Sequence, residues 1–207
     1  LRLGDGGPKA LRQLALYGQP PIRLRATQSL ARIDRTAAIP ELVTALFAAD
    51  STPQEVQFAT DTLRRRSDKL PSRTHAVALL TRELEQLREN AARIDRDDRI
   101  TFLWSIDDGR TQVSVQPVLA LLSTYRDAVD AASRLRRIGN LPLKIERSAM
   151  SADIAYRLMV DPDWGDPDQI TAFRQSFGES AAGSSLMTAI AEALEGDDVP
   201  VLVGLLR

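Results

Sequence analysis

The sequence predicts a mainly α-helical fold, in which helical repeats are followed by a smaller C-terminal segment of α+β type or of further helices. Leucine occurs 28 times and alanine 27 times in 207 residues, while aromatic residues make up 5%. This composition favours closely packed helices over a β-sandwich. Apolar residues recur every three or four positions in the first half, whereas they alternate with polar residues after residue 99. We therefore expect helical repeats over 1–95 and a different segment over 96–207, with a β-hairpin near 100–115.

The charge balance and the missing cysteines exclude several classes of function. The chain has 27 Lys and Arg against 28 Asp and Glu, and its net charge of −1 makes a nucleic-acid partner unexpected. Without cysteine there is no disulfide, no thiolate zinc site and no cysteine nucleophile. Apolar runs fall short of the ~20 residues of a membrane helix. We expect a soluble, cytoplasmic protein without a membrane partner, and a fragment of a longer chain because it begins at Leu1 in sequence typical of a folded region.

Residues 21–47 carry the clearest helical pattern. Spacings of four, four and three define one apolar stripe, formed by Ile22, Ala26, Leu30 and Ile33. The opposite face of this predicted helix carries Arg23, Arg25, Gln28 and Arg32. After a break at Asp34, a second stripe follows, formed by Ile39, Leu42, Val43 and Leu46. The two predicted helices together form a helical hairpin.

A five-residue motif recurs at a distance typical of helical repeats. Residues 59–63 (ATDTL) echo residues 26–30 (ATQSL) at an offset of 33 positions. Together with the two stripes, this pattern resembles the HEAT-like repeat, in particular the short bacterial type also found in phycobilisome lyases. The resemblance covers about residues 8–94. It implies a superhelical scaffold with an interaction role, further repeats upstream and no catalytic residues.

A longer helix is expected after Pro71. Its apolar residues alternate at spacings of three and four, namely Val77, Leu80, Leu84, Leu87, Ala91 and Ile94. This seam spans fewer heptads than a coiled coil needs, so core packing is the preferred interpretation over a dimer seam.

The second half predicts strands and then helices. Alternation over 100–106 and 111–115 flanks the turn residues Asp107 to Arg110, which indicates a hairpin. A helix follows from Val118 to Ile138, ended by Gly139. We expect a third strand over 141–146 and then helices near 151–160, 167–177 and 184–195. The alternative, that repeats continue, stays open because residues 131–139 and 199–203 echo parts of the first unit.

Arginines of the predicted repeats are the main candidate binding residues. The proposed set is Arg25, Arg32, Arg64, Arg65 and Arg73. Clustered guanidinium groups would attract an acidic protein partner. The competing interpretation of the run 64–66 is a solvated helix end, where cations meet the negative end of the helix dipole.

A second candidate set lies at the predicted hairpin and consists of Trp104, Asp107 and Asp108. The paired acids resemble those that hold magnesium in palm-type cyclases and polymerases. The four-residue spacing of Trp104 and Asp108 resembles that of HEAT-like alkylpurine DNA glycosylases, which would need a helix here. Turn chemistry alone also accounts for Asp and Gly at these positions.

No metal or cofactor is expected. Residues 161–168 hold four aspartates, but their spacing fails the EF-hand pattern, and Asp166 as a helix N-cap before Pro167 accounts for them. The only histidine, His75, is expected at the surface.

The sequence favours a non-enzymatic protein–protein interaction scaffold or regulatory module that binds a protein partner on the helical-repeat surface. The alternatives are a HEAT-like bilin lyase or chaperone, a HEAT-like nucleic-acid enzyme, and a sensor segment of a larger multidomain protein.

Overall fold

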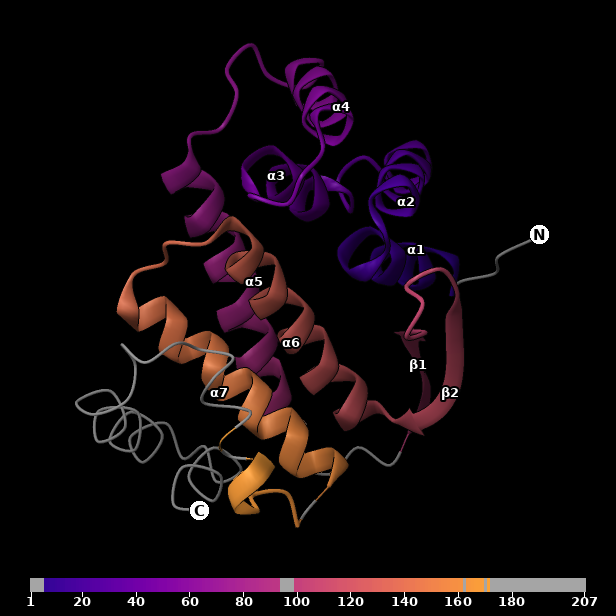
Figure 1. The fold of residues 1–207 in the computed structure, drawn as a ribbon, viewed down its shortest axis with the longest axis vertical. Coiled ribbons are helices and arrows are strands. Elements are labelled where there is room, and N and C mark those ends of the chain that lie inside the picture. The colour runs from indigo at the N-terminus through magenta and orange to yellow at the C-terminus, as the bar shows by residue number, and fades with distance from the viewer. Residues whose placement is uncertain (1–5, 94–98, 162, 170, 172–207) are drawn as a thin grey trace.

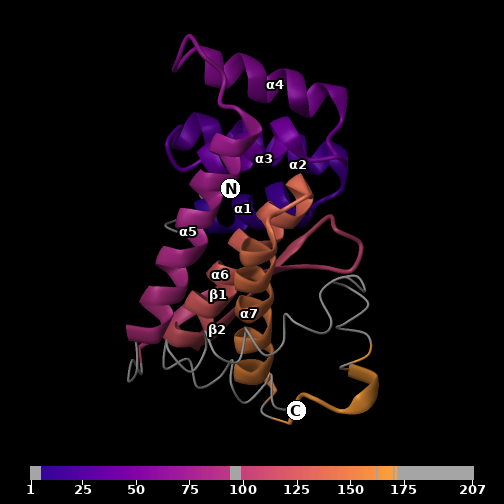
Figure 2. The same cartoon turned by 90° about the vertical axis from the view of Figure 1, so that its left-hand side faces the viewer.

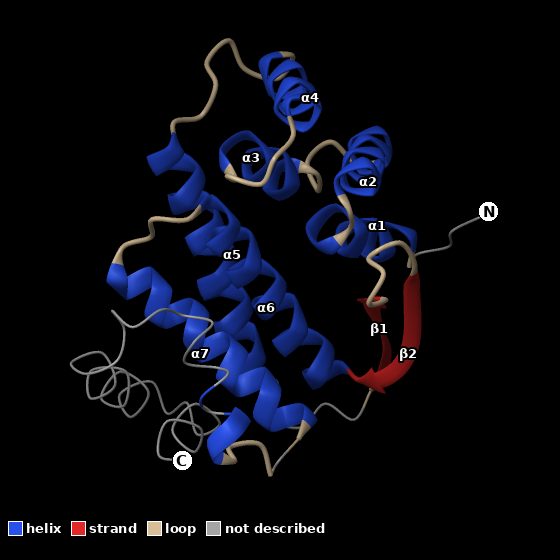
Figure 3. Ribbon diagram, viewed as in Figure 1, coloured by secondary structure: helices blue, strands red, loops and turns tan. Residues whose placement is uncertain are grey.

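The computed structural model describes residues 6–93, 99–161, 163–169 and 171, and these residues form a mainly helical protein with one small antiparallel sheet (Figure 3). The first five helices are α1 (Gly7–Tyr17), α2 (Pro20–Ile33), α3 (Ile39–Phe47), α4 (Pro53–Arg64) and α5 (Arg73–Arg93). After them come β1 (Ile100–Ile106), β2 (Val113–Leu119), α6 (Ala120–Ile138) and α7 (Leu143–Val160). No helix within this described part is long and apolar enough to cross a membrane.

Proline marks the first turn of each of the first four helices, where its missing N–H costs no hydrogen bond. Helix α4 has the most complete start. The Thr52 hydroxyl accepts a hydrogen bond from the Glu55 amide at 3.2 Å, and the Thr52 amide donates to the Glu55 carboxylate at 2.8 Å. This capping box fixes the point at which α4 begins.

Helices α1 to α4 pack as two pairs, α1 with α2 and α3 with α4 (Figure 1). The prediction that the two helices of residues 21–47, α2 and α3, form a hairpin is therefore wrong, because α2 packs extensively on α1 and not on α3. The echo at an offset of 33 residues relates α2 to α4, the second helix of each pair. In both helices the shared alanine and leucine are buried, namely Ala26, Leu30, Ala59 and Leu63.

Two other details of α2 also differ from the prediction. Ile33, expected in the apolar stripe, is the last residue of the helix and is 60% exposed. Arg23, expected on the solvent face, is 6% exposed. Its guanidinium is buried because two carboxylates from later in the chain neutralise it, Glu55 at 2.9 Å and Asp50 at 3.1 Å.

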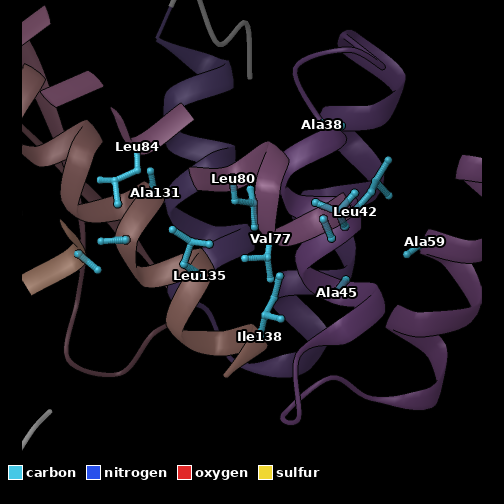
Figure 4. Packing of buried hydrophobic residues seen from close by; sticks show 14 of the residues in the cluster. Ala38, Leu42, Ala45, Ala59, Val77, Leu80, Leu84, Ala131, Leu135 and Ile138 are labelled. Atoms are coloured by element: carbon cyan, nitrogen blue, oxygen red, sulfur yellow. The ribbon is translucent and has the colours of Figure 1, made fainter. Parts of the chain in front are cut away.

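Helices α5, α6 and α7 pack side by side, and α6 lies between the other two (Figure 1). The seam of α5 is buried: Leu80 and Leu84 are fully covered and face Ala131, Leu135 and Ile138 of α6 (Figure 4). The core interpretation of this seam is confirmed for the residues described, which exclude Ile94. The main hydrophobic cluster runs from α2 to α7, so it crosses the predicted boundary at residue 95, which stays a prediction.

The hairpin predicted near 100–115 is confirmed, with its second strand four residues longer. Strands β1 and β2 pair in antiparallel register, with Trp104 opposite Val115 and Ile106 opposite Val113. Because Val118 pairs with Thr101 in this sheet, the following helix begins at Ala120 and not at Val118. Figure 2 shows the hairpin beside α1 and α6.

The third strand predicted over 141–146 is wrong. Gly139 ends α6 with φ of 72°, and Pro142 is the N-cap of α7, which runs from Leu143 through the helix predicted near 151–160. Ile145 and Ala149 are four positions apart in α7 and pack on the core, whereas Leu143, the first residue of the helix, is 45% exposed. The alternating apolar residues 141, 143 and 145 therefore do not share one buried face, as they would in a strand. The helix predicted near 167–177 starts within the described residues at Pro167; the one near 184–195 and the echo at 199–203 lie outside them.

Candidate functional site

A groove of about 520 Å³ opens between α2 and α4, with α3 as its floor. Four arginines line it, two from the end of α2 and the turn after it, and two from the turn after α4. They are Arg32, Arg35, Arg65 and Arg66, and we call this site the arginine groove. The volume lies within the range of small-ligand and peptide pockets.

The arginine groove is strongly positive. All four of its arginines are exposed, and none of its lining residues is acidic. The nearest carboxylate in the turn after α2 is Asp34, whose charge acts on Arg66. Hydrogen bonds from the amides of Ala37 and Thr36 lower the pKa of Asp34 below its usual range, so it stays ionised at neutral pH. One carboxylate against four guanidinium groups leaves the groove with a net positive charge.

The structure brings only part of the predicted arginine set together. Arg32 and Arg65 line the groove, while Arg25 and Arg64 are exposed but lie outside it. Arg73 is elsewhere in the molecule. Its guanidinium donates hydrogen bonds to the carbonyl oxygens of Ile138, Gly139 and Asn140, where it satisfies the open C-terminal end of α6.

The predicted set of binding residues does not include Arg35 or Arg66, although Arg66 belongs to the arginine run considered for an acidic partner and Arg35 stands close to Arg32. Arg35 follows Arg32 by three positions, and Arg66 is the last residue of the run 64–66. A signal was present, because both lie just beyond the ends of α2 and α4, which the 33-residue echo relates to each other. Equivalent turns at the ends of equivalent helices are expected to lie near each other in stacked repeats.

The second candidate set is explained by the hairpin turn. The Asp107 carboxylate accepts hydrogen bonds from the amides of Thr111 and Gln112 at 2.8 and 2.7 Å, and these bonds lower its pKa. Asp108 is exposed in the same turn, and Trp104 is in strand β1. The helix that a glycosylase-like pairing of Trp104 and Asp108 requires is therefore absent from this part of the chain, and Asp107 is committed to its own turn.

The hairpin tip is also tied to the start of α2. The Gln19 amide donates to the Arg110 carbonyl at 3.1 Å, and the Gln19 side chain donates to the Gly109 carbonyl at 3.0 Å. These bonds give the turn a structural role.

A second, smaller cavity of about 80 Å³ lies between α1, α5, β1 and α6 and is lined mainly by charged and polar side chains. Asp130 lies at one side of it and accepts hydrogen bonds from Gln13, from Tyr17 at 2.8 Å and from Arg126 at 3.1 Å. Arg126 also stacks over the ring of Tyr17, 5.3 Å from its centroid. Burial, and then the charge of Asp130, raise the pKa of Tyr17, which stays a neutral phenol.

On the other side of this cavity, Arg134 holds two carboxylates. It contacts Glu41 at 2.7 Å and Glu83 at 3.6 Å. Burial raises the pKa of Glu83 above its usual range against the opposing effect of Arg134. These acids and bases join α1, α3, α5 and α6 to one another, so their arrangement explains how the helices are fixed in register.

No group of acidic or histidine side chains in the described residues has the geometry of a metal site. In the acidic run after α7, Asp166 accepts hydrogen bonds from the amides of Asp168 and Gln169, both at 2.9 Å. This confirms Asp166 as an N-cap. His75 is exposed, as predicted.

Comparison of this chain with protein-family models, with curated proteins and with solved structures finds no match. The resemblance to HEAT-like repeats therefore stays a proposal that rests on the sequence pattern.

Proposed function

We propose that this chain is a non-enzymatic interaction module of HEAT-like repeats that binds an acidic segment of a partner protein in the arginine groove. The observation that carries the proposal is the concentration of four exposed arginines around a groove that has no acidic lining residue. Planar guanidinium groups form paired hydrogen bonds with carboxylates, which gives such a surface both attraction and geometric selectivity.

The repeat part of this proposal is supported by the helix pairing. In α1 with α2 and α3 with α4, the second helix of each pair carries the same buried alanine and leucine spacing. Stacked helix pairs create extended surfaces on which repeat proteins bind their partners. The groove lies between the second helices of the two pairs, where stacked repeats would present such a surface.

A protein partner is favoured over a nucleic acid by the charge of the whole chain. The net charge of −1 gives no long-range attraction to a polyanion, so the positive potential is confined to the groove and its surroundings. Attraction over that short range suits a short acidic segment.

The test is the binding of a dye-labelled glutamate-rich peptide, measured by fluorescence anisotropy at two salt concentrations. The double variant Arg32→Glu with Arg65→Glu removes two groove cations. Arg25→Glu with Arg64→Glu makes the same change in net charge outside the groove. We expect the groove variant to lose about tenfold or more in affinity and the control variant about twofold.

Three results would contradict the proposal. Equal losses in both variants would show that attraction is spread over the surface, and wild-type protein that fails to bind the peptide at low salt would remove the acidic partner altogether. A single-stranded oligonucleotide of equal charge that binds more tightly than the peptide would replace the protein partner with a nucleic acid.

A further inference from the structure

The arginine groove changes in chemistry with depth. Its floor and walls contain apolar side chains from α2, α3 and α4, namely Ala31, Ile39, Leu42, Phe58 and Leu63. Leu42 is 1% exposed, while Ile39 and Phe58 are partly buried and pack against the core. The arginines stand at the exposed rim. The groove therefore combines apolar side chains with exposed arginines, and the uncharged polar residues Gln28, Thr36 and Thr62 complete its lining.

The basic edges lie on two sides. Arg32 and Arg35 belong to the end of α2 and the turn after it, whereas Arg65 and Arg66 belong to the turn after α4. The apolar residues of α3 and the Phe58 side chain of α4 contribute to the same groove. The Arg66 guanidinium also reaches across to the turn after α2, where it donates to the Thr36 hydroxyl at 3.4 Å. A ligand in the groove therefore meets positive charge from both turns, beside the partly buried side chains of Ile39 and Phe58.

Neither a purely acidic nor a purely apolar ligand matches both the apolar lining and the arginines of the groove. A purely acidic chain leaves the apolar floor in contact with water and gains nothing from burying it. A purely apolar segment covers the rim and removes water from guanidinium groups without supplying hydrogen-bond acceptors, which is unfavourable. The matching ligand carries an apolar side chain between carboxylates.

Resting on the proposed function, we propose that the occupant of the arginine groove is a short partner segment in which a large apolar side chain is flanked on both sides by acidic residues. The apolar side chain inserts against Ile39 and Phe58. Its acidic neighbours pair with Arg32 and Arg35 at one edge and with Arg65 and Arg66 at the other. Specificity then comes from the order acidic, apolar, acidic and not from total charge.

The experiment compares three dye-labelled peptides of equal length with the full wild-type chain by fluorescence anisotropy. The first has leucine anchors flanked by glutamates. In the second, serine replaces leucine at unchanged charge, and in the third, glutamine replaces glutamate around the same anchors. We expect the first peptide to bind most tightly and each of the others to lose about tenfold or more.

A substitution in the protein tests where the leucine side chain of the peptide binds. Phe58→Ala shortens the wall without changing charge, and it is expected to weaken the leucine peptide while leaving the serine peptide unchanged. Thermal unfolding of this variant checks that it is folded. The peptide comparison uses wild-type protein, so the proposal stays testable even where Phe58→Ala fails to fold.

The outcomes separate this inference from the function on which it rests. If the serine peptide binds as tightly as the leucine peptide, the apolar anchor is wrong while the acidic partner stands. If the glutamine peptide binds as tightly as the leucine peptide, the flanking acids are wrong, and the proposed function falls with them. Loss of the difference between leucine and serine peptides in Phe58→Ala supports the assigned anchor position, and an unchanged difference in the folded variant overturns it.

Discussion

Arg134 of α6 lies 2.7 Å from Glu41 of α3, and the two side chains are 4% and 2% exposed although 93 positions separate them in sequence. The pair joins the helices that carry the groove to the bundle of α5, α6 and α7. An ion pair so deeply buried is sensitive to the loss of either partner, because the remaining charge has no water to solvate it.

Replacing Arg134 by methionine is expected to lower the free energy of unfolding by about 3–5 kcal/mol, because Glu41 and Glu83 lose their common cation. Urea denaturation followed by circular dichroism measures this. Arg137→Met is the matched control: its pairing partner Asp50 is half exposed, so the loss is expected to be about 1 kcal/mol or less. Equal losses of unfolding free energy in the two variants would show that the buried Arg134 pair stabilises the protein no more than the partly exposed Arg137 pair.

Glu83 is expected to make the protein less stable as pH rises. Burial raises its native pKa above the unfolded value, while Arg134 and Arg12 oppose the shift and Glu41 and Asp130 support it. At a pH between the unfolded and the native pKa of Glu83, the native state binds more protons than the unfolded state. The contribution of Glu83 to stability is therefore present at low pH and is lost as pH rises through the native pKa. Glu83→Gln removes the effect. The stability of Glu83→Gln relative to wild type, measured by urea denaturation, is expected to rise as pH increases from the unfolded pKa through the native pKa of Glu83; a constant difference would contradict this.

Glu55 is expected to have the opposite pH dependence. Burial raises its pKa, but hydrogen bonds from Arg23 and from Thr52 outweigh burial and lower the pKa below its usual range. Its contribution is therefore present above the unfolded pKa and is lost as pH falls through the native one. Glu55→Gln is expected to be less stable than wild type at neutral pH, and the difference is expected to shrink on acidification. A deficit that persists unchanged at low pH would assign the loss to packing and not to charge.

Gly6 gives a steric prediction at the contact between the start of α1 and the hairpin. A Cβ at this position would lie 2.5 Å from Cζ2 of Trp104, so Gly6→Ala forces the indole to move. The backbone φ of −77° suits any residue, which makes the effect purely one of space. We expect a loss of about 1–3 kcal/mol and a shifted Trp104 fluorescence maximum in a Trp164→Phe background. An unchanged spectrum would show that the contact is not kept in solution.

Patterns that act over a few residues predicted much of the fold. The stripe of α5, the hairpin turn at Asp107 and the N-cap at Asp166 all follow from neighbours within seven positions. The errors share a cause as well. Over 141–146 apolar and polar residues alternate as in a strand, and only the cap at Pro142, the packing of Ile145 on the core and the 45% exposure of Leu143 distinguish the helix.

For the candidate site, the sequence shows the arginine run 64–66 at a predicted helix end, and its composition excludes cysteine and multi-histidine chemistry. Which arginines lie together depends on how the helices pack. Arg23 is enclosed by Glu55 and Asp50, Arg73 binds the end of α6, and Arg32 and Arg65 remain exposed in one groove. The sequence does not distinguish these arginines from one another. Their roles differ because the carboxylates that pair with them and the carbonyl groups that accept their hydrogen bonds come from distant parts of the chain. Local periodicity sets the helices, whereas the burial of charge depends on which helices pack together.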